Sequence, residues 1–211
     1  MATILAFGDS LTYGARPDAL KRHAHADLWP TVLGQALGPA HRVIAEGMNG
    51  RTTVFASPLA SGLRSGAEVL PTLLNSHAPL DLVILMLGTN DVMVSEMSAR
   101  AAARGMDRLA EIVRSHPYWG GMAAPKVLLV APPGIRPDAL GETTDRDIAE
   151  IGKLARAYRR VAGLRGLAFF DAGTVTQGAD PDGVHLDAAG NHALGAALAP
   201  VVTGLLGLDA P

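Results

Sequence analysis

A serine near the start of the chain and an aspartate–histidine pair near its end have the residue types of a nucleophile and its general base. Ser10 directly follows the apolar run Thr3–Phe7 and has glycines nearby on both sides, which predicts a tight turn with an accessible hydroxyl near a helix start. Asp182 and His185 are three residues apart. This spacing lets the carboxylate accept the Nδ1 proton of the imidazole and leaves Nε2 to face a hydroxyl.

Two further residues could donate hydrogen bonds to an oxygen that becomes negative during acyl transfer. Gly50 has no Cβ to keep a ligand from its backbone N–H, and Asn90 offers an uncharged side-chain amide. Taken singly, each of the five residues also has an ordinary structural role in a turn, a helix cap or an exposed loop. Their conjunction in one chain is what favours nucleophilic catalysis.

The elements that must position these residues alternate between apolar runs and segments with helical spacing. The expected strands are Thr3–Phe7, Arg42–Ala45, Leu82–Leu87, Val127–Ala131 and a weaker Leu167–Phe170. The expected helices are Asp27–Leu37, Gly62–Ser76, with a kink or break at Pro71, Ser98–Ser115, Thr143–Leu164 and Asp187–Leu205. Such alternation predicts an α/β fold with a parallel sheet covered by helices on both faces. Ligand sites then lie beyond the carboxyl ends of the strands.

Composition narrows the class of protein. The 211 residues, 48% of them hydrophobic, can bury one sizeable core, and we expect a single domain over 1–211. A net charge of −2 disfavours nucleic-acid binding, and the absence of cysteine excludes disulfides, zinc–thiolate sites and a cysteine nucleophile. The N-terminus lacks the features of a signal peptide, and runs such as Leu80–Leu87 are too short to span a bilayer. We therefore expect a cytoplasmic protein without a membrane segment.

Four short blocks of the sequence resemble those of a known enzyme superfamily. They are Gly8-Asp9-Ser10-Leu11, Gly50, Gly88-Thr89-Asn90-Asp91 and Asp182-Gly183-Val184-His185. In this order and spacing they are similar to the four blocks of the SGNH hydrolases, also called GDSL esterases. Glu46–Thr53 and Phe169–Gly173 further resemble the bacterial arylesterase and acyltransferase (perhydrolase) branch.

The resemblance implies a fold and a set of roles. The fold would be a flavodoxin-like three-layer α/β/α sandwich with five parallel strands in the order 2-1-3-4-5. Ser10 would be the nucleophile and His185 the base, oriented by Asp182. The backbone N–H groups of Ser10 and Gly50 and the Asn90 amide would form the oxyanion hole. No cofactor or metal is implied, the partner is a small-molecule ester, and a homo-oligomer is expected.

The substrate is expected to be a small, neutral ester with a short acyl chain, aryl esters included. This expectation depends on an apolar mouth formed by Leu11, Tyr13, Met48, Val92, Met93 and Val184. An apolar mouth also favours transfer of the acyl group to an alcohol or to hydrogen peroxide in competition with water. Ala15 stands where perhydrolase-type relatives carry a bulky aromatic residue, which predicts a wider mouth.

Three alternatives stay open at this point. One is a carbohydrate O-deacetylase of the same fold. Another is a flavodoxin-like nucleotide- or flavin-binding module, although no G-x-x-x-x-G-K-[ST] or G-x-G-x-x-G motif follows the first strand. The third concerns His23-x-His25-x-Asp27, which could chelate a divalent metal or form a solvated loop. Tyr118 and Trp119 could cover a site mouth or a subunit contact, or pack on the surface.

Overall fold

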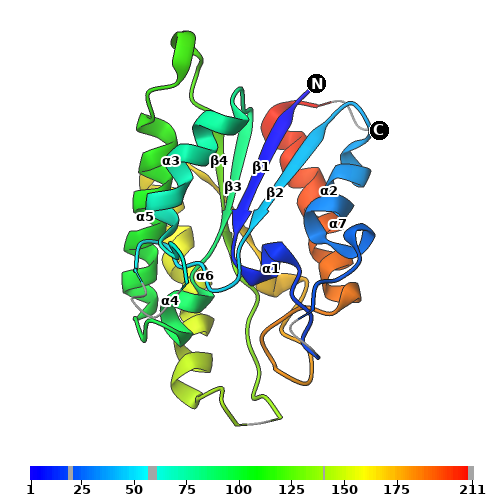
Figure 1. The fold of residues 1–211 in the computed structure, drawn as a ribbon, viewed down its shortest axis with the longest axis vertical. Coiled ribbons are helices and arrows are strands. Elements are labelled where there is room, and N and C mark those ends of the chain that lie inside the picture. The colour runs from blue at the N-terminus through cyan, green and yellow to red at the C-terminus, as the bar shows by residue number, and fades with distance from the viewer. Residues whose placement is uncertain (19–20, 57–60, 140, 209–211) are drawn as a thin grey trace.

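The computed structural model describes residues 1–18, 21–56, 61–139 and 141–208. Five parallel strands form one sheet in the order β2-β1-β3-β4-β5 (Figure 1), which confirms the predicted fold. The strands are β1 (Thr3–Gly8), β2 (Arg42–Gly47), β3 (Leu82–Met86), β4 (Lys126–Ala131) and β5 (Ala168–Asp171). Their carboxyl ends lie at the lower end of the sheet in Figure 1.

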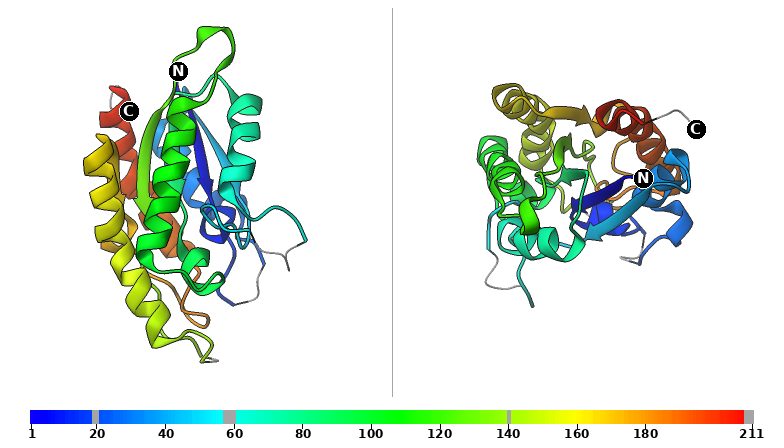
Figure 2. Two further views of the ribbon diagram at one scale, coloured as in Figure 1. Left: turned by 90° about the vertical axis from the view of Figure 1, so that its left-hand side faces the viewer. Right: turned by 90° about the horizontal axis from the view of Figure 1, so that it is seen from above.

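Helices cover both faces of the sheet (Figure 2). The longer ones are α2 (Trp29–Leu37), α3 (Gly66–His77), α5 (Ala99–Ser115), α6 (Asp145–Arg165) and α7 (Ala188–Leu206). One core joins α3, α5 and α6 to the sheet, and the other joins α2 and α7 to its opposite face. Because side chains alternate along a strand, Leu5 and Phe7 belong to the first core and Ile4 and Ala6 to the second. Two buried faces explain why β1 is apolar at every one of these positions.

The carboxyl ends of the three strands nearest the candidate site are level with one another. Gly8, the last residue of β1, pairs with Gly47 of β2 and with Met86 of β3. The short helix α1 (Ser10–Tyr13) starts directly beyond this point. It packs so closely on β2 that a Cβ at Gly47 would lie 2.0 Å from the backbone nitrogen of Tyr13. The absence of a side chain at Gly47 therefore allows α1 its place at the sheet edge.

The helix boundaries differ from the sequence expectations in two respects. The segment Gly62–Ser76 becomes helical only at Gly66, and α3 then continues without a break through Pro71. A proline inside a helix removes one backbone hydrogen bond and crowds the carbonyl four residues before it, but the buried Leu70 and Leu74 anchor the helix in the core on both sides of Pro71. The short helices α1 and α4 (Thr89–Met93) have too few residues to show a helical period.

One helix is long and apolar enough to cross a membrane by length and composition alone. This is α7, with 19 residues and a mean hydropathy of 1.2, which the sequence analysis did not single out. Leu194, Leu198 and Val202 of α7 are fully buried in the core that it shares with α2. Packing against α2 and the sheet buries 33% of its most apolar window.

We predict that Gly47→Ala displaces α1 and destabilises the fold. The new methyl group meets rigid backbone, so the free energy of unfolding should fall by about 1–3 kcal/mol, the usual cost of overpacking. The matched control is Gly163→Ala on the exposed face of α6, where a Cβ meets nothing within 4 Å. There the change should be stabilising by about 0.5–1 kcal/mol, as for Gly to Ala in a helix. Urea denaturation measures both, and equal stabilities for the two variants would contradict the prediction.

Candidate active site

Ser10 is the first residue of α1, at the carboxyl end of β1. Asp9 caps this helix, because its side chain accepts a hydrogen bond from the Leu11 N–H at 3.0 Å. Only 9% of Ser10 is exposed. Its Oγ lies 2.9 Å from Nε2 of His185, and as the first helical residue its own N–H has no partner within the helix. The hydroxyl and that N–H can therefore act on the same bound group.

The imidazole of His185 is held by Asp182 on the segment between β5 and α7. Nδ1 of His185 lies 2.6 Å from Oδ2 of Asp182. Oδ1 of Asp182 accepts the backbone N–H groups of Val184 and His185, each at 2.9 Å. With these bonds the carboxylate fixes the ring so that Nδ1 faces Asp182 and Nε2 faces Ser10. The structure thus brings together all three residues singled out in the sequence, although Ser10 and His185 are 175 positions apart.

The two candidate oxyanion donors are placed differently by the structure. Asn90, the second residue of α4, lines the same cavity as Ser10 and His185. Its Nδ2 donates to the Arg51 carbonyl at 3.0 Å and lies 3.5 Å from Oδ2 of Asp9. Gly50 lies half-buried in the turn after β2, with φ of +73°, and is not among the described residues that line the cavity. Its role as a donor stays a prediction.

Two carboxylates are buried beneath these residues, which sequence reasoning did not anticipate. Burial raises the pKa of Asp9 to about 7; Asp91 adds to this increase, while the Leu11 N–H and Arg51 oppose it. Burial also raises the pKa of Asp91 to about 6, against the opposing effect of its hydrogen bonds from Thr53. Nothing in the sequence marks an aspartate beside a catalytic serine as buried.

Arg51 fixes the loop after β2 to the end of β1. Its Nη1 donates to the carbonyl oxygens of Gly8, at 2.8 Å, and of Glu46, and its guanidinium lies over the Phe7 ring at 4.3 Å. Burial lowers the pKa of Arg51 to about 10 against the attraction of Glu46 and Asp9, so the side chain is charged at neutral pH. The Arg51 carbonyl that orients Asn90 is therefore part of a rigid support.

The triad residues open onto a cavity of about 500 Å³ that we call the site cavity. Its apolar lining includes Met93, Val94 and Val184, together with Pro17, Ala139 and Pro181. The carboxylate-bearing residues Asp18, Asp138 and Glu142 also line it, whereas the described part of the lining contains no lysine or arginine. Arg16 pairs with Asp18 at 2.6 Å, so the charge of that carboxylate is compensated. The mouth is therefore more polar than the sequence predicts, because loops distant in the sequence contribute to it.

Four of the six residues expected at the mouth lie elsewhere. Leu11 and Val92 are 3% and 0% exposed. Leu11 belongs to the core that contains α2 and α7, and Val92 belongs to the core that contains α3, α5 and α6, because each residue lies on the inward face of its short helix. Tyr13 stacks with Arg22, and neither Tyr13 nor Met48 is among the described lining residues. Only Met93 and Val184 line the cavity as predicted.

Ala15 lies outside the described lining of the site cavity, so its effect on the width of the mouth stays a prediction. Ala15 is 2% exposed and pairs with Arg22 in an isolated bridge.

The remaining candidate residues lie apart from the site cavity. His23 contacts the Leu186 carbonyl and Asp27 contacts His192, and no group of three or more potential metal ligands is found in the described residues. Trp119 lies on the loop that enters β4 at its amino end, the upper end of the sheet in Figure 1. It is 78% exposed and too distant to cover the site mouth.

We predict that Asp9 makes stability depend on pH. Because the folded pKa of about 7 exceeds the ordinary value of 3.8, the folded protein keeps a proton that the unfolded chain releases between these pH values. The free energy of unfolding should therefore fall as pH rises through this window, by up to about 1.4 kcal/mol per pH unit from this group. Asp9→Asn removes the titration and keeps an oxygen to cap α1.

Urea denaturation between pH 4 and pH 7 measures this slope. It should be shallower for Asp9→Asn than for the parent, whereas Asp145→Asn at an exposed position should leave it unchanged. An Asp9→Asn slope equal to that of the parent would show that Asp9 ionises normally in the folded state.

Comparisons with known proteins agree with this geometry. Residues 6–193 match the GDSL-like lipase/acylhydrolase family, and a search of curated proteins gave no match. A carbohydrate acetylesterase family member from Sinorhizobium meliloti is 43% identical, with a TM-score of 0.94 over 99% of this chain and 100% of that one. The M. smegmatis aryl esterase is 39% identical, with a TM-score of 0.92 over 98% of this chain and 100% of that one.

A second carbohydrate acetylesterase from Sinorhizobium meliloti is 34% identical, with a TM-score of 0.92 over 97% of this chain and all of that one. The family match spans all four blocks, and the similar esterases share the fold over nearly the whole chain. The strand order alone is common to flavodoxin-like proteins, so it is the family match that favours the esterase over a flavodoxin-like binding module. The chain belongs to the GDSL-like lipase/acylhydrolase family and is an enzyme of the SGNH hydrolase superfamily.

Proposed function

We propose that this enzyme is a serine esterase that cleaves small carboxylic esters through an acyl-enzyme. The observation that carries the proposal is the continuous chain of hydrogen bonds from Asp182 through His185 to Ser10, which opens onto the site cavity beside Asn90. This arrangement supplies an activated nucleophile, a base that is held in one orientation and a donor for the oxyanion.

In the first half of the reaction, Ser10 Oγ attacks the ester carbonyl carbon while its proton moves to Nε2 of His185. The carbonyl oxygen becomes an oxyanion, to which Asn90 and the Ser10 N–H donate, together with the Gly50 N–H. The bond to the alcohol oxygen then breaks, and the alcohol leaves with the proton from His185. Asp182 stabilises the imidazolium in between. Water repeats the sequence on the acyl-enzyme and releases the acid.

The site cavity favours short acyl chains on an uncharged or hydroxyl-bearing alcohol. Met93, Val94 and Val184 give it an apolar part, which suits a short alkyl or aryl group. Glu142 and Asp18, the latter paired with Arg16 at 2.6 Å, offer acceptors at the rim for hydroxyl groups. The rim supports the second candidate, a carbohydrate O-deacetylase, as do the two similar carbohydrate acetylesterases. The similar aryl esterase supports the first.

Acyl transfer is a further part of the proposal. The acyl-enzyme reacts with whichever nucleophile reaches it, and an apolar wall lowers the local concentration of water relative to that of an organic alcohol. Met93, Val94 and Val184 provide such a wall beside Ser10. We therefore propose that primary alcohols and hydrogen peroxide compete with water, although hydrolysis keeps a substantial share.

Assembly and location also enter as proposals. We propose a homo-oligomer from the resemblance of the sequence to the arylesterase and acyltransferase branch; Trp119, which is 78% exposed, is one apolar side chain that a second copy could cover. A cytoplasmic location is proposed from the sequence alone.

We predict that Ser10→Ala abolishes ester cleavage and leaves the protein folded. Removal of the nucleophile should lower kcat by about 10³-fold or more, measured with p-nitrophenyl acetate and with an acetylated monosaccharide. The relative rates of the parent on these two esters distinguish the two candidate substrate classes. The control Ser115→Ala changes an exposed serine at the end of α5 and should be fully active.

A sulfonyl fluoride should label the parent once per chain, on the peptide that contains Ser10. Turnover of the Ser10→Ala variant within tenfold of the parent would exclude the proposed nucleophile.

We predict measurable transfer of an acetyl group from vinyl acetate to benzyl alcohol in water. Val94→Ser should lower the ratio of benzyl acetate to acetic acid, because it makes the cavity wall more polar. Val175→Ser, at a valine that is 38% exposed and outside the described lining, serves as the matched control and should leave the ratio unchanged. Chromatography of both products over time measures the ratio. If benzyl acetate does not exceed the level found without enzyme, the proposed acyl transfer is wrong and the enzyme only hydrolyses the ester.

A further inference from the structure

One wall of the site cavity is formed by a segment with an unusual backbone. Met93 and Val94, which line the cavity, lie at the end of α4 and are followed by a short connection to α5. Within it, Glu96 has φ of +53°, a left-handed conformation that residues with a side chain rarely adopt. Such a conformation persists where the surroundings determine it, so the contacts of this connection are informative.

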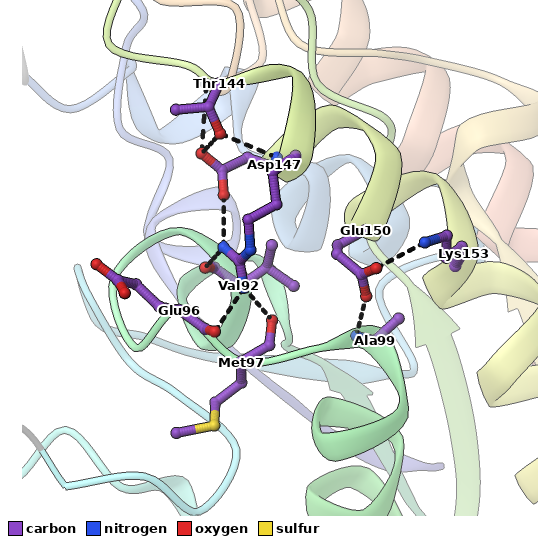
Figure 3. Close-up of polar contacts among 9 residues, drawn as sticks. Val92, Glu96, Met97, Ala99, Thr144, Asp147, Glu150 and Lys153 are labelled. Atoms are coloured by element: carbon purple, nitrogen blue, oxygen red, sulfur yellow. Dashed lines mark hydrogen bonds and ion pairs between the residues drawn. The ribbon is translucent and has the colours of Figure 1, made fainter.

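Arg146, in the first turn of α6, supplies those contacts. Its Nη1 donates to the Val92 carbonyl at 3.3 Å, and its Nη2 donates to the carbonyls of Met97, at 3.1 Å, and Glu96. Figure 3 shows these three residues converging on one point beside α6. One guanidinium thus holds the backbone on both sides of Met93 and Val94.

The same guanidinium is tied to a second wall of the cavity. Nη1 of Arg146 also donates to Oδ1 of Asp147 at 3.0 Å. Oδ2 of Asp147 accepts from the Thr144 hydroxyl at 2.6 Å and its N–H at 3.3 Å, in the capping box that starts α6 (Figure 3). Thr143, the residue before that box, lines the cavity. Arg146 therefore connects the wall that ends at Thr143 with the wall that carries Met93.

A neighbouring side chain of α6 supports the connection at its far end. Oε2 of Glu150 accepts the N–H of Ala99, the first residue of α5, at 2.7 Å, and its Oε1 pairs with Lys153 at 2.6 Å. Figure 3 shows this second contact beside the first. The connection between α4 and α5 is consequently held to α6 by side chains at Glu96, at Met97 and at the start of α5.

We propose that Arg146 is a positioning residue that sets the acyl-chain limit of the enzyme. It contacts no residue of the triad, and it acts by fixing Met93 and Val94 against the space that the acyl group occupies. This inference rests on the proposed esterase function. A lysine cannot replace the planar guanidinium, because one ammonium cannot bond three carbonyls and a carboxylate in this geometry.

The test compares Arg146→Met and Arg146→Lys with Arg160→Met. Arg160 lies on the exposed surface of α6, and its side chain makes no hydrogen bond or ion pair with the described residues, so its variant should match the parent. We measure kcat/KM for p-nitrophenyl acetate and p-nitrophenyl hexanoate. For Arg146→Met the acetate value should fall by about tenfold, because a small misplacement of the wall is costly, while the hexanoate value is unchanged or higher. Arg146→Lys should lie between the parent and Arg146→Met.

A purely structural role predicts a different pattern, in which both esters lose activity by the same factor. That result, or unchanged kinetics in Arg146→Met and Arg146→Lys, would overturn the proposal. If Arg146→Met does not fold, the acetate to hexanoate ratio of Arg146→Lys decides between the two outcomes in the same way.

Hydrogen exchange gives a readout that does not depend on activity. Amides of residues 92–99 should exchange faster in Arg146→Met than in the parent or in Arg160→Met, and unchanged exchange would overturn the proposal. If the parent cleaves neither ester, the proposed function fails, and the exchange measurement alone decides whether Arg146 holds this wall.

Discussion

Asp9 and Asp91 are almost completely removed from solvent, and the need to satisfy their carboxylates governs the architecture around the nucleophile. A buried carboxylate is costly unless hydrogen bonds and an opposite charge compensate it. The backbone N–H and hydroxyl of Thr53 satisfy Asp91. Asp9 receives the Leu11 N–H and the attraction of Arg51. Together with the hydrogen bonds of Arg51, these contacts tie α1, the loop after β2 and α4 to one another at the ends of β1, β2 and β3.

The catalytic consequence is that the nucleophile and the amide donor share one rigid support, while the base arrives from elsewhere. Ser10 and Asn90 both belong to that support, and Asn90 is oriented by the Arg51 carbonyl. His185 lies on a separate segment and meets the support through its bond to Ser10. Its orientation therefore depends on Asp182, which is held by backbone N–H groups of its own segment. The rigid support and the segment that carries Asp182 and His185 are thus held by separate sets of hydrogen bonds. They meet at the hydrogen bond between Ser10 and His185, along which the proton moves.

The features that depend on short stretches of sequence, such as the strands and the catalytic blocks, could be predicted from the sequence. The features that depend on contacts between distant segments, such as the lining of the site cavity, could not. Strands buried on both faces are visible as apolar runs, and the four blocks by themselves indicated that Ser10, Asn90 and His185 follow strand ends. Leu11 and Val92 were assigned to the mouth because helices of four or five residues have no period that reveals their inward face. The same limit hid the carboxylates of the rim and the contacts of Arg146, which join segments about 50 positions apart.

The catalytic groups Ser10 and Asn90 lie on the rigid support, whereas the walls of the site cavity are formed by other segments. This division explains how enzymes of one fold can act on different alcohols. The carbohydrate acetylesterase family member and the aryl esterase superimpose on this chain with TM-scores of 0.94 and 0.92, yet their names specify different substrates. Acyl transfer requires the rigid support to have the same shape for every substrate, because the oxyanion and the nucleophile have the same geometry for every ester. The alcohol and the acyl chain contact the walls, which are loops and helix ends around Val94, Thr143 and Val184. Substitutions there change which ester fits without disturbing the buried carboxylates, so the substrate can change while the chemistry stays the same.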